Sequence, residues 1–280
     1  MKIGFQIMFE DAGLEDIIAN AKREGFNCIE INLTDPNFYP DRIKKENYNA
    51  IKNSDIDILL HAPNTLSFFF FEKHYVNASI EIMKEIIDFA DELKIKVITM
   101  HIGDSCTISY LGKIQKLHDF FPDEFKNIVY DALCEVFVYA KDKSPYLSIE
   151  NAGAVKTDLG KEIVERILNE FKQAKLTWDW GHTNLRKNKE REREEKFFEK
   201  HLDRVIEVHL HDNKGDYDEH NVVGKGNVNF RKYLKIMENH DPYYIFEIRP
   251  ADRVRESYKN FMKIKGGKDV YAYTLFDSRL

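Results

Sequence analysis

Short runs of apolar, often β-branched residues alternate with longer amphipathic segments along the whole chain. The short runs predict eight β-strands. Their ranges are Lys2–Ile7, Cys28–Leu33, Ile56–His61, Val97–His101, Leu147–Asn151, Leu176–Trp180, Val205–His211 and Tyr244–Ile248. The longer segments carry apolar residues three and four positions apart, which predicts helices. Their ranges are Leu14–Arg23, Ala78–Leu93, Phe125–Ala140, Lys161–Phe171, Glu194–Leu202, Phe230–Asn239 and Val254–Ile264.

This alternation of strands and helices implies a parallel sheet. Eight strand–helix units in 280 residues fit a closed (β/α)8 TIM barrel, so we predict an α/β fold with one barrel domain over residues 1–280. An open doubly wound sheet is the alternative. Its dinucleotide-binding form would place GxGxxG after the first strand, where the chain reads FQIMFEDAG. Residues 268–280 form a C-terminal tail, and we expect its apolar side chains to pack under the barrel or against another subunit. These side chains are Val270, Tyr271, Tyr273, Leu275 and Phe276.

Residue types that bind metal stand at or just after the carboxyl ends of six consecutive predicted strands. In chain order they are His61, His101, Glu150, Asp179, His182, His209, Asp218, His220 and Glu247. The carboxyl ends of barrel strands converge on one face, where active sites form. Crowded, buried carboxylates repel one another, and a bound dication removes that cost. Mixed histidine and carboxylate ligands favour zinc or manganese, so we predict a divalent metal site.

Taken singly, several of these residues have structural explanations. His61 fits a hydrogen-bonded residue at the rim, and Glu247 fits an ion pair with Arg249. Strand alternation turns His211 to the same side as His209, which makes His211 a rival ligand. The remaining histidines fall on predicted helices or loops and are expected at the surface. They are His74, His118, His201 and His240. Only the joint pattern over six strands predicts the site.

The amino-acid composition limits the kinds of binding partner that the sequence predicts. The chain is 43% hydrophobic and carries a net charge of −6, so it lacks the overall positive field typical of nucleic-acid binding. Its one basic cluster, residues 186–204, is interleaved with glutamates and is interpreted as a solvated helix face. No apolar run approaches the roughly 20 residues of a membrane span, and the first residues lack a signal-peptide pattern. Three widely spaced cysteines fit a reducing compartment, so a cytoplasmic location without membrane contact is expected.

The segment HLHDNKGDYDEHNVVGKGNVNF at 209–230, together with HAP, HIG, IEN, DWGH and FEIRP, resembles the xylose isomerase-like TIM barrel superfamily. The resemblance covers nearly the whole chain. This superfamily includes sugar isomerases and epimerases, and also endonuclease IV, a zinc-dependent repair enzyme for abasic DNA. In both branches the matching residues form a common metal site, which the resemblance assigns here to Glu150, Asp179, His209 and Glu247.

The two branches imply different chemistry. In the isomerase and epimerase branch, one ion chelates two adjacent oxygens of a sugar or sugar-like polyol, phosphorylated or not. Glu150 and Glu247 then exchange a proton as base and acid through an enediolate. His182 and Arg249 are candidates for holding substrate hydroxyls or a phosphate. The endonuclease IV branch implies a zinc-dependent phosphodiesterase that binds up to three zinc ions and abasic DNA. Its additional ligands would be His61, His101, His182, Asp218 and His220.

Three stretches depart from the repair enzymes. After the second strand the chain reads IEINLTDPNFYPDRI, without an aromatic, arginine-bearing loop that enters DNA. HIGD replaces an HPGS-like motif, and NTLSFFFF provides an apolar lid, Phe68–Phe71, suited to a small ligand. We also expect Trp178 and Trp180 to exclude water from the site. The leading hypothesis is therefore a sugar isomerase or epimerase, with oligomeric state open. The phosphodiesterase is the alternative, and a non-catalytic metal scaffold is a third, least favoured option because paired glutamates are typical of proton transfer.

Overall fold

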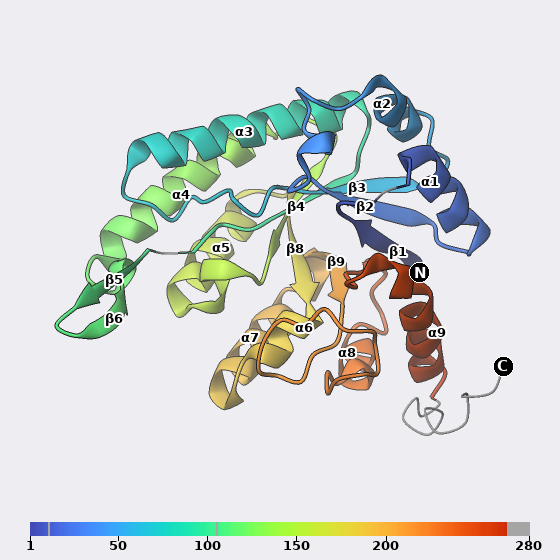
Figure 1. Ribbon diagram of the computed structural model, residues 1–280. Helices are drawn as coiled ribbons and strands as arrows, with labels where there is room; N and C mark the ends of the chain where they lie inside the picture. Colours follow the sequence, from blue (N-terminus) through green and yellow to red (C-terminus); the bar gives the residue numbers. More distant parts are fainter. Residues whose placement is uncertain (11, 105, 268–280) are drawn as a thin grey trace.

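The computed structural model describes residues 1–10, 12–104 and 106–267. Within these residues eight parallel strands close into a barrel in the order β1-β10-β9-β8-β7-β4-β3-β2 (Figure 1). The strands are β1 (Lys2–Ile7), β2 (Cys28–Asn32), β3 (Asp57–His61), β4 (Val97–Met100), β7 (Tyr146–Glu150), β8 (Ala174–Asp179), β9 (Val205–Leu210) and β10 (Tyr243–Phe246). The predicted TIM barrel is confirmed, and each strand ends within two residues of its predicted end.

Helices cover the outside of this barrel (Figure 1). They are α1 (Leu14–Arg23), α2 (Lys45–Lys52), α3 (Lys73–Glu92), α4 (Pro122–Tyr139), α5 (Asp158–Glu170), α6 (Trp180–Leu185), α7 (Asn188–Lys200), α8 (Phe230–Ile236) and α9 (Val254–Lys265). Single 3-10 turns lie at Pro36–Phe38, Leu117–Asp119, Gly153–Lys156, Leu202–Arg204 and Ala251–Arg253. All predicted helices are present. The sequence pattern missed α2, because Ile51 is its only buried residue and its apolar periodicity is correspondingly weak. It also missed α6, which is only six residues long and begins at Trp180, where the predicted strand ends.

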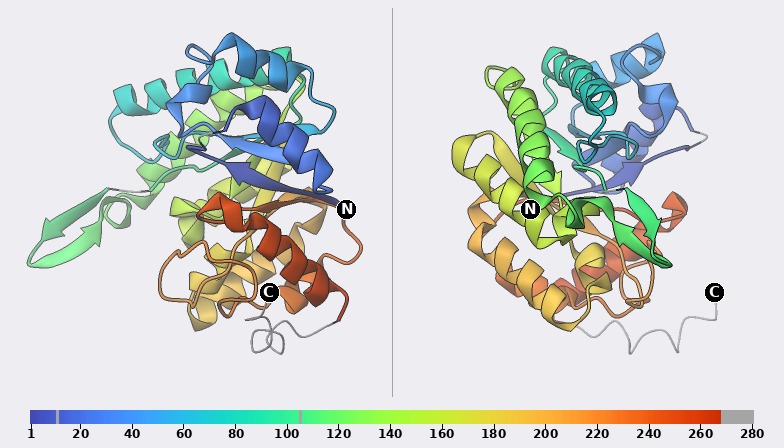
Figure 2. Two further views of the ribbon diagram at one scale, coloured as in Figure 1. Left: turned by 45° about the vertical axis from the view of Figure 1, so that its right-hand side comes forward. Right: turned by 90° about the vertical axis from the view of Figure 1, so that its left-hand side faces the viewer.

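A two-stranded hairpin interrupts the barrel pattern between β4 and α4. Its strands, β5 (Thr107–Tyr110) and β6 (Lys113–Lys116), pair antiparallel and project away from the barrel (Figure 2). The turn residue Leu111 is 83% exposed and Ile114 is 75% exposed. The sequence analysis did not predict this hairpin, since its strands are only four residues long and bury no face against a helix.

The main apolar core lies between the strands and the surrounding helices. Trp178 and Trp180 belong to it: both are fully buried, and the Trp178 ring stacks on Phe198 of α7 at 4.9 Å between centroids. Both indoles also contact Tyr233 of α8. The expectation that these tryptophans exclude water from the site was wrong. Alternate residues of β8 point to opposite faces, so the faces that bear Trp178 and Asp179 differ.

The predicted apolar lid is likewise mostly core. Phe68 and Phe69 are fully buried, and Phe69 packs beside Phe125 of α4. Only Phe70 of this run lines a cavity at the barrel mouth. His118, expected at the surface, is 4% exposed and packs edge-on against Phe69. The four phenylalanines therefore anchor a loop and contribute one ring to the mouth.

In the part of the chain that the structure describes, no helix is both long and apolar enough to cross a membrane. The predicted tail, with Val270, Tyr271, Tyr273, Leu275 and Phe276, lies outside the described residues.

Candidate metal centre

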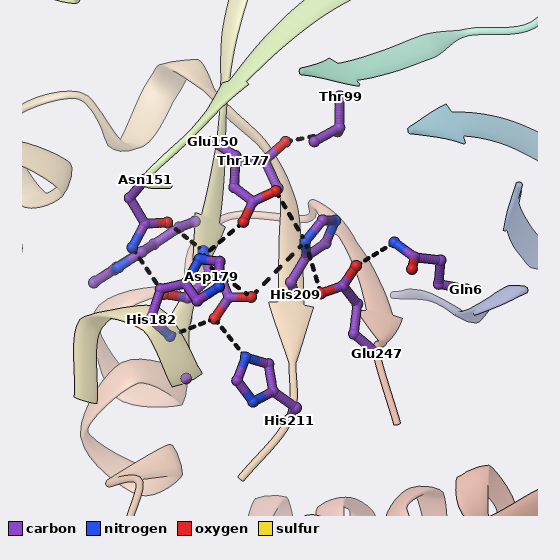
Figure 3. A network of polar contacts seen from close by, with 12 residues as sticks. Gln6, Thr99, Glu150, Asn151, Thr177, Asp179, His182, His209, His211 and Glu247 are labelled. Carbon is purple, nitrogen blue, oxygen red and sulfur yellow. Dashed lines mark hydrogen bonds and ion pairs between the residues drawn. The ribbon is translucent and has the colours of Figure 1, made fainter. Parts of the chain in front are cut away.

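The central group of the site consists of Glu150, Asp179 and His209, whose candidate ligand atoms all lie within 4.8 Å of one another. His209 Nδ1 is 3.5 Å from Glu150 Oε2 and 3.9 Å from Asp179 Oδ2 (Figure 3). Glu247 completes the surroundings, with its Oε2 3.7 Å from the same nitrogen. All four side chains are buried. The four residues predicted to share one ion are thus brought together around one point.

Strand register explains this convergence. Asp179 of β8 is the register partner of His209 of β9, and Glu150 of β7 pairs with Thr177 of β8. The backbone N–H of Glu247 donates to Leu210 O at 3.1 Å, which fixes the chain just beyond β10. Because side chains alternate along a strand, Thr177 and Asp179 point to the same face of β8, so Glu150, Asp179 and His209 all face the barrel axis.

Two histidines flank the central group and form its side group, His61 and His101. Their Nε2 atoms lie 3.1 and 3.0 Å from Glu150 Oε2. Glu150 Oε1 is in turn 2.9 Å from His182 Nδ1. Besides His209, this carboxylate therefore contacts three further imidazoles, which is the arrangement expected of a ligand shared between neighbouring ions.

A third set, the rim group, lies nearer solvent and consists of His182, Asp218 and His220. Asp218 Oδ2 is 3.2 Å from His182 Nε2 and 3.1 Å from His220 Nε2. The rival ligand His211 lies between the groups, with its Nε2 3.2 Å from Asp179 Oδ1 and 3.4 Å from Asp218 Oδ1. Asp179, His182 and His211 form one possible ligand triad, and His211, Asp218 and His220 form another.

Local hydrogen bonds orient the histidines. The Nδ1 of His61 lies 2.8 Å from Ala62 O, and the Nδ1 of His220 lies 2.9 Å from Glu247 O. Each Nδ1–H donates to a carbonyl, which leaves Nε2 available as a ligand. His220 adopts φ 45°, a left-handed conformation that costs a non-glycine residue about 1–2 kcal/mol. Asp179 Oδ1 accepts the backbone N–H of His182 at 2.7 Å, which caps α6 and places His182 over the site.

The central group is strongly charged. Burial raises the pKa of Glu150, but the nearby imidazoles of His101 and His209 outweigh burial and hold it well below its ordinary value. Burial lowers the pKa of His61, but its hydrogen bond to Glu150 and the charges of Glu30 and Glu247 raise it to about 9. In the same way, opposing charges hold the pKa of Asp179 at about 2.

Several buried atoms here have no hydrogen-bond partner among the described residues. They include Asp179 Oδ2 and both ring nitrogens of His209. Unsatisfied buried polar atoms are rare and cost roughly 1–3 kcal/mol each. A divalent cation among these donors would satisfy Asp179 and His209 and offset the carboxylate charges. The residues present therefore fit a metal of the borderline type that histidine and carboxylate bind.

Sequence reasoning missed the layer directly beneath. Glu30 Oε1 lies 3.5 Å and Glu207 Oε1 lies 3.7 Å from His209 Nε2, and both glutamates are fully buried. Burial, with the neighbouring charge of Glu30, raises the pKa of Glu207 to about 7. Gln6 donates to Glu30 Oε2 at 2.7 Å and also to Glu247 (Figure 3). The available signal was a glutamate between two apolar residues in each of two strand segments, CIEIN and VIEVHL.

Arg249 does not form an ion pair with Glu247 within 4.0 Å among the described residues. Its guanidinium donates to Gln6 Oε1 and to Ile248 O. Through Gln6 it is linked to Glu247. Its proposed contact with substrate stays a prediction, and the structure adds a role in orienting Gln6.

The loop after β9 carries the rim group and is held by Asp212. The Asp212 carboxylate accepts the backbone N–H of Gly224 at 2.8 Å and that of Val228 at 3.1 Å. A Cβ at Gly226 would lie 2.2 Å from Asn213 O, so this close approach requires glycine. The DN and GKG portions of the long motif, residues 212–213 and 224–226, are therefore structural, and they hold the loop that carries Asp218.

A cavity of about 440 Å³ opens above the ligands. It is lined by His101, His182 and Asp218 together with Phe70 and the cationic side chains of Lys156 and Arg186. Such a volume suits a small molecule of monosaccharide size.

The fold and this cluster define a TIM barrel with a candidate metal centre at the carboxyl ends of its strands. The chain belongs to the xylose isomerase-like TIM barrel family, whose sequence model matches residues 18–264. An uncharacterized protein of Methanocaldococcus jannaschii is 24% identical over 204 residues, which cover 72% of this chain and 74% of that protein. A probable endonuclease 4 of Aquifex aeolicus is 25% identical over 249 residues, which cover 80% and 84%. A crystal structure of a D-tagatose 3-epimerase-like protein superposes with a TM-score of 0.74 at 22% identity and covers 95% of this chain and 99% of that one.

Proposed function

We propose that this protein is a divalent-metal-dependent isomerase or epimerase of a sugar or sugar-like polyol. The observation that carries the proposal is the meeting of two buried carboxylates, Glu150 and Glu247, at His209 Nδ1, 3.5 and 3.7 Å away. His101 and His182, which contact Glu150, line a cavity sized for a small molecule. The likeness to a D-tagatose 3-epimerase-like protein supports the same chemistry.

Each residue then has a role. A cation held by Glu150, Asp179, His209 and Glu247 would polarise the substrate carbonyl and acidify the adjoining C–H bond. Glu247 accepts that proton: burial raises its pKa, but the charges of His209 and His220 outweigh burial, so it is ionised at neutral pH. Gln6, which donates to Glu247, fixes the carboxylate plane. Glu150 is ionised, so it relays to the substrate a proton from His61, which lies 3.1 Å away and whose pKa of about 9 keeps it protonated at neutral pH. Glu247 releases the proton that it accepted to solvent, so the protons balance and the reaction is redox-neutral.

The proposal is tested by Glu247→Gln, which keeps the shape of the side chain and removes the base. We expect proton exchange at the substrate carbon to fall by about 10²- to 10⁴-fold. The measurement is deuterium uptake from D₂O into a panel of ketoses, followed by NMR. Glu219→Gln is the matched control, since Glu219 lies on the loop after β9, between Asp218 and His220, but belongs to no candidate ligand triad. Bound metal and thermal melting of each variant are recorded in parallel. Wild-type exchange in metal-loaded Glu247→Gln protein contradicts the proposed role.

A second candidate is a zinc-dependent phosphodiesterase of the endonuclease IV type. The specific observation that favours it is the assembly of the side and rim groups beside the central group, with Glu150 in contact with three imidazoles. Clustered metals can generate hydroxide and stabilise phosphoryl oxygens. The relative from Aquifex aeolicus supports this alternative. More than one zinc ion per chain, combined with cleavage of a duplex that carries an abasic site, would favour it. A single ion without cleavage would exclude it.

A further inference from the structure

A second cavity, of about 390 Å³, adjoins the mouth and has a markedly basic wall. Five cationic side chains line it, against two acidic ones. The cations are Lys116, Lys156, Lys161, Arg186 and Arg193. Lys156 and Arg186 also line the mouth cavity above the metal ligands, so the two cavities share a wall. We call this second space the basic cavity.

Three separate elements build the basic cavity on the carboxyl side of the barrel. Lys116 ends strand β6 of the projecting hairpin, and Lys161 lies in the first turns of α5. Arg186 and Arg193 flank the start of α7, within the glutamate-rich cluster of residues 186–204. That cluster was interpreted as a solvated helix face, and the structure places part of it against the mouth instead.

Some of this charge is already compensated. Arg193 Nη1 is 2.9 Å from Asp158 Oδ2, and Arg186 Nε is 3.2 Å from the buried Glu194. Lys156 Nζ lies 3.6 Å from Asp104 Oδ2 in an exposed pair. Exposed pairs of this kind contribute little and exchange partners easily.

Lys161 is different, because it is half-buried and its ammonium has no carboxylate within 4.0 Å among the described residues. It donates to the backbone carbonyl of Lys156 at 3.1 Å. Burial lowers the pKa of Lys161, which shows that its charged form lacks full compensation. Lys116, on the facing hairpin, also has no carboxylate within that distance in residues 1–10, 12–104 and 106–267. Two ammonium groups without a carboxylate within 4.0 Å among the described residues therefore line this cavity.

We propose that the basic cavity binds the phosphate group of a phosphorylated sugar whose reacting carbons lie over the metal ligands. This inference rests on the proposed isomerase or epimerase function and narrows its substrate class. A phosphate carries up to two negative charges and three strong acceptor oxygens, which match lysine and arginine donors converging from several directions. The mouth cavity balances Asp104 and Asp218 against Lys156 and Arg186, whereas the basic cavity has five cations against two carboxylates. The basic cavity, one wall away, is the place where such a group gains free energy.

The test compares D-fructose 6-phosphate with D-fructose as calorimetric probes on metal-loaded Glu247→Gln protein, which binds without turnover. Lys161→Met is expected to weaken binding of the phosphorylated probe by about 10- to 100-fold and leave the free sugar unchanged. Lys116→Met, at the hairpin, provides an independent variant with a smaller effect in the same direction. The matched control is Lys175→Met. Lys175 is also half-buried with a pKa lowered by burial, but it lies near the amino end of β8, at the opposite end of the barrel.

Equal affinity for the two probes, or equal weakening by Lys161→Met and Lys175→Met, overturns the inference. Inorganic phosphate is titrated in parallel, because its binding does not depend on any sugar being the substrate. If inorganic phosphate bound in a Lys161-dependent way but no sugar exchanged deuterium, the isomerase proposal would be refuted. The basic cavity would still be an anion-binding site. An abasic duplex bound through Lys161 more tightly than the sugar phosphate would assign the site to a phosphodiester and overturn the sugar-phosphate inference.

Discussion

The central group and the rim group of the metal centre differ in what holds them. Glu150, Asp179 and His209 are at most 1% exposed and stand on or at the ends of paired strands. Asp218 and His220 are 36% and 22% exposed and stand on the loop after β9. Strand register holds the first set, whereas hydrogen bonds to Asp212 hold the loop of the second. Sites on strands are positioned more accurately than sites on loops.

This difference separates the two candidate functions. The proposed proton transfer next to a carbonyl uses the central group together with Glu247, which supplies the second carboxylate and a fourth metal donor. The rim group adds donors for a further ion, which phosphodiester cleavage requires and isomerisation does not. How independently the two groups bind metal is therefore the property to measure.

The largest expected effect separates the groups directly. Asp179→Asn removes a carboxylate from a buried charge cluster, which costs about 3–5 kcal/mol. Central metal affinity should therefore fall by at least about 100-fold. Asp218→Asn should change the affinity of the central ion by less than about threefold and remove only an ion held at the rim. Competition with a chromogenic chelator and elemental analysis give both quantities. A similar loss in both variants would show that the two groups form one cooperative cluster.

Much of the barrel and its ligands could be predicted from the sequence for a physical reason. Parallel strands buried on both faces form short apolar runs, and the chain places a polar residue at or just after each relevant end, as in LLHAPN and LSIENAG. Barrel closure then brings ligands from distant positions together. The ligands could therefore be predicted from the positions of the strand ends alone, and the order of apolar and polar residues along the chain reveals these ends.

What the sequence did not reveal depends on which face a side chain takes and on what it meets there. Glu30 and Glu207 lie in strands with no exposed residue. The order of polar and apolar residues in these strands therefore does not show which side chains face the barrel axis and which face the helices. Trp178 shows the same difficulty, because a tryptophan beside a ligand fits either the mouth or the core. Lys161 appears as an ordinary helix residue, and only the folded chain brings it near the mouth.

The next largest expected effect is the pH dependence of metal affinity, because metal binding at the side and rim groups should release protons. Burial lowers the pKa of His220, but Asp218 and Glu247 outweigh burial and raise it to about 9, as Glu150 does for His61. Both are therefore protonated at pH 7 without metal, and a metal must displace those protons. Affinity should rise by about tenfold per pH unit for each proton displaced between pH 6.5 and 9. Calorimetry in buffers of different ionisation enthalpy counts the protons.

The same shifts predict the pH dependence of the metal-free protein. A histidine whose folded pKa exceeds its unfolded value stabilises the fold below about pH 6.5, and this contribution is lost as the pH rises through about 9. The metal-free protein should therefore melt at lower temperature at pH 9 than at pH 7, to a greater extent than a His61→Gln, His220→Gln double variant. If the melting temperature of the metal-free protein fell between pH 7 and pH 9 by no more than that of the double variant, the charges assigned to His61 and His220 would be contradicted.

The smallest expected effect concerns the layer beneath the central group. Glu207 and Glu30 approach His209 Nε2, which favours a proton on Nε2 and leaves Nδ1 free toward Glu150 and Asp179. Glu207→Gln should weaken metal binding by about tenfold, at the lower end of effects seen when a partner of a ligand histidine is changed. Burial raises the pKa of Glu207 from its ordinary value of 4.5 to about 7. Ionisation of Glu207 therefore destabilises the metal-free fold as the pH rises above about 4.5. At pH 8 the variant should therefore melt at the same or a higher temperature while it binds metal less tightly. A parallel loss of stability and affinity would assign Glu207 a purely structural role.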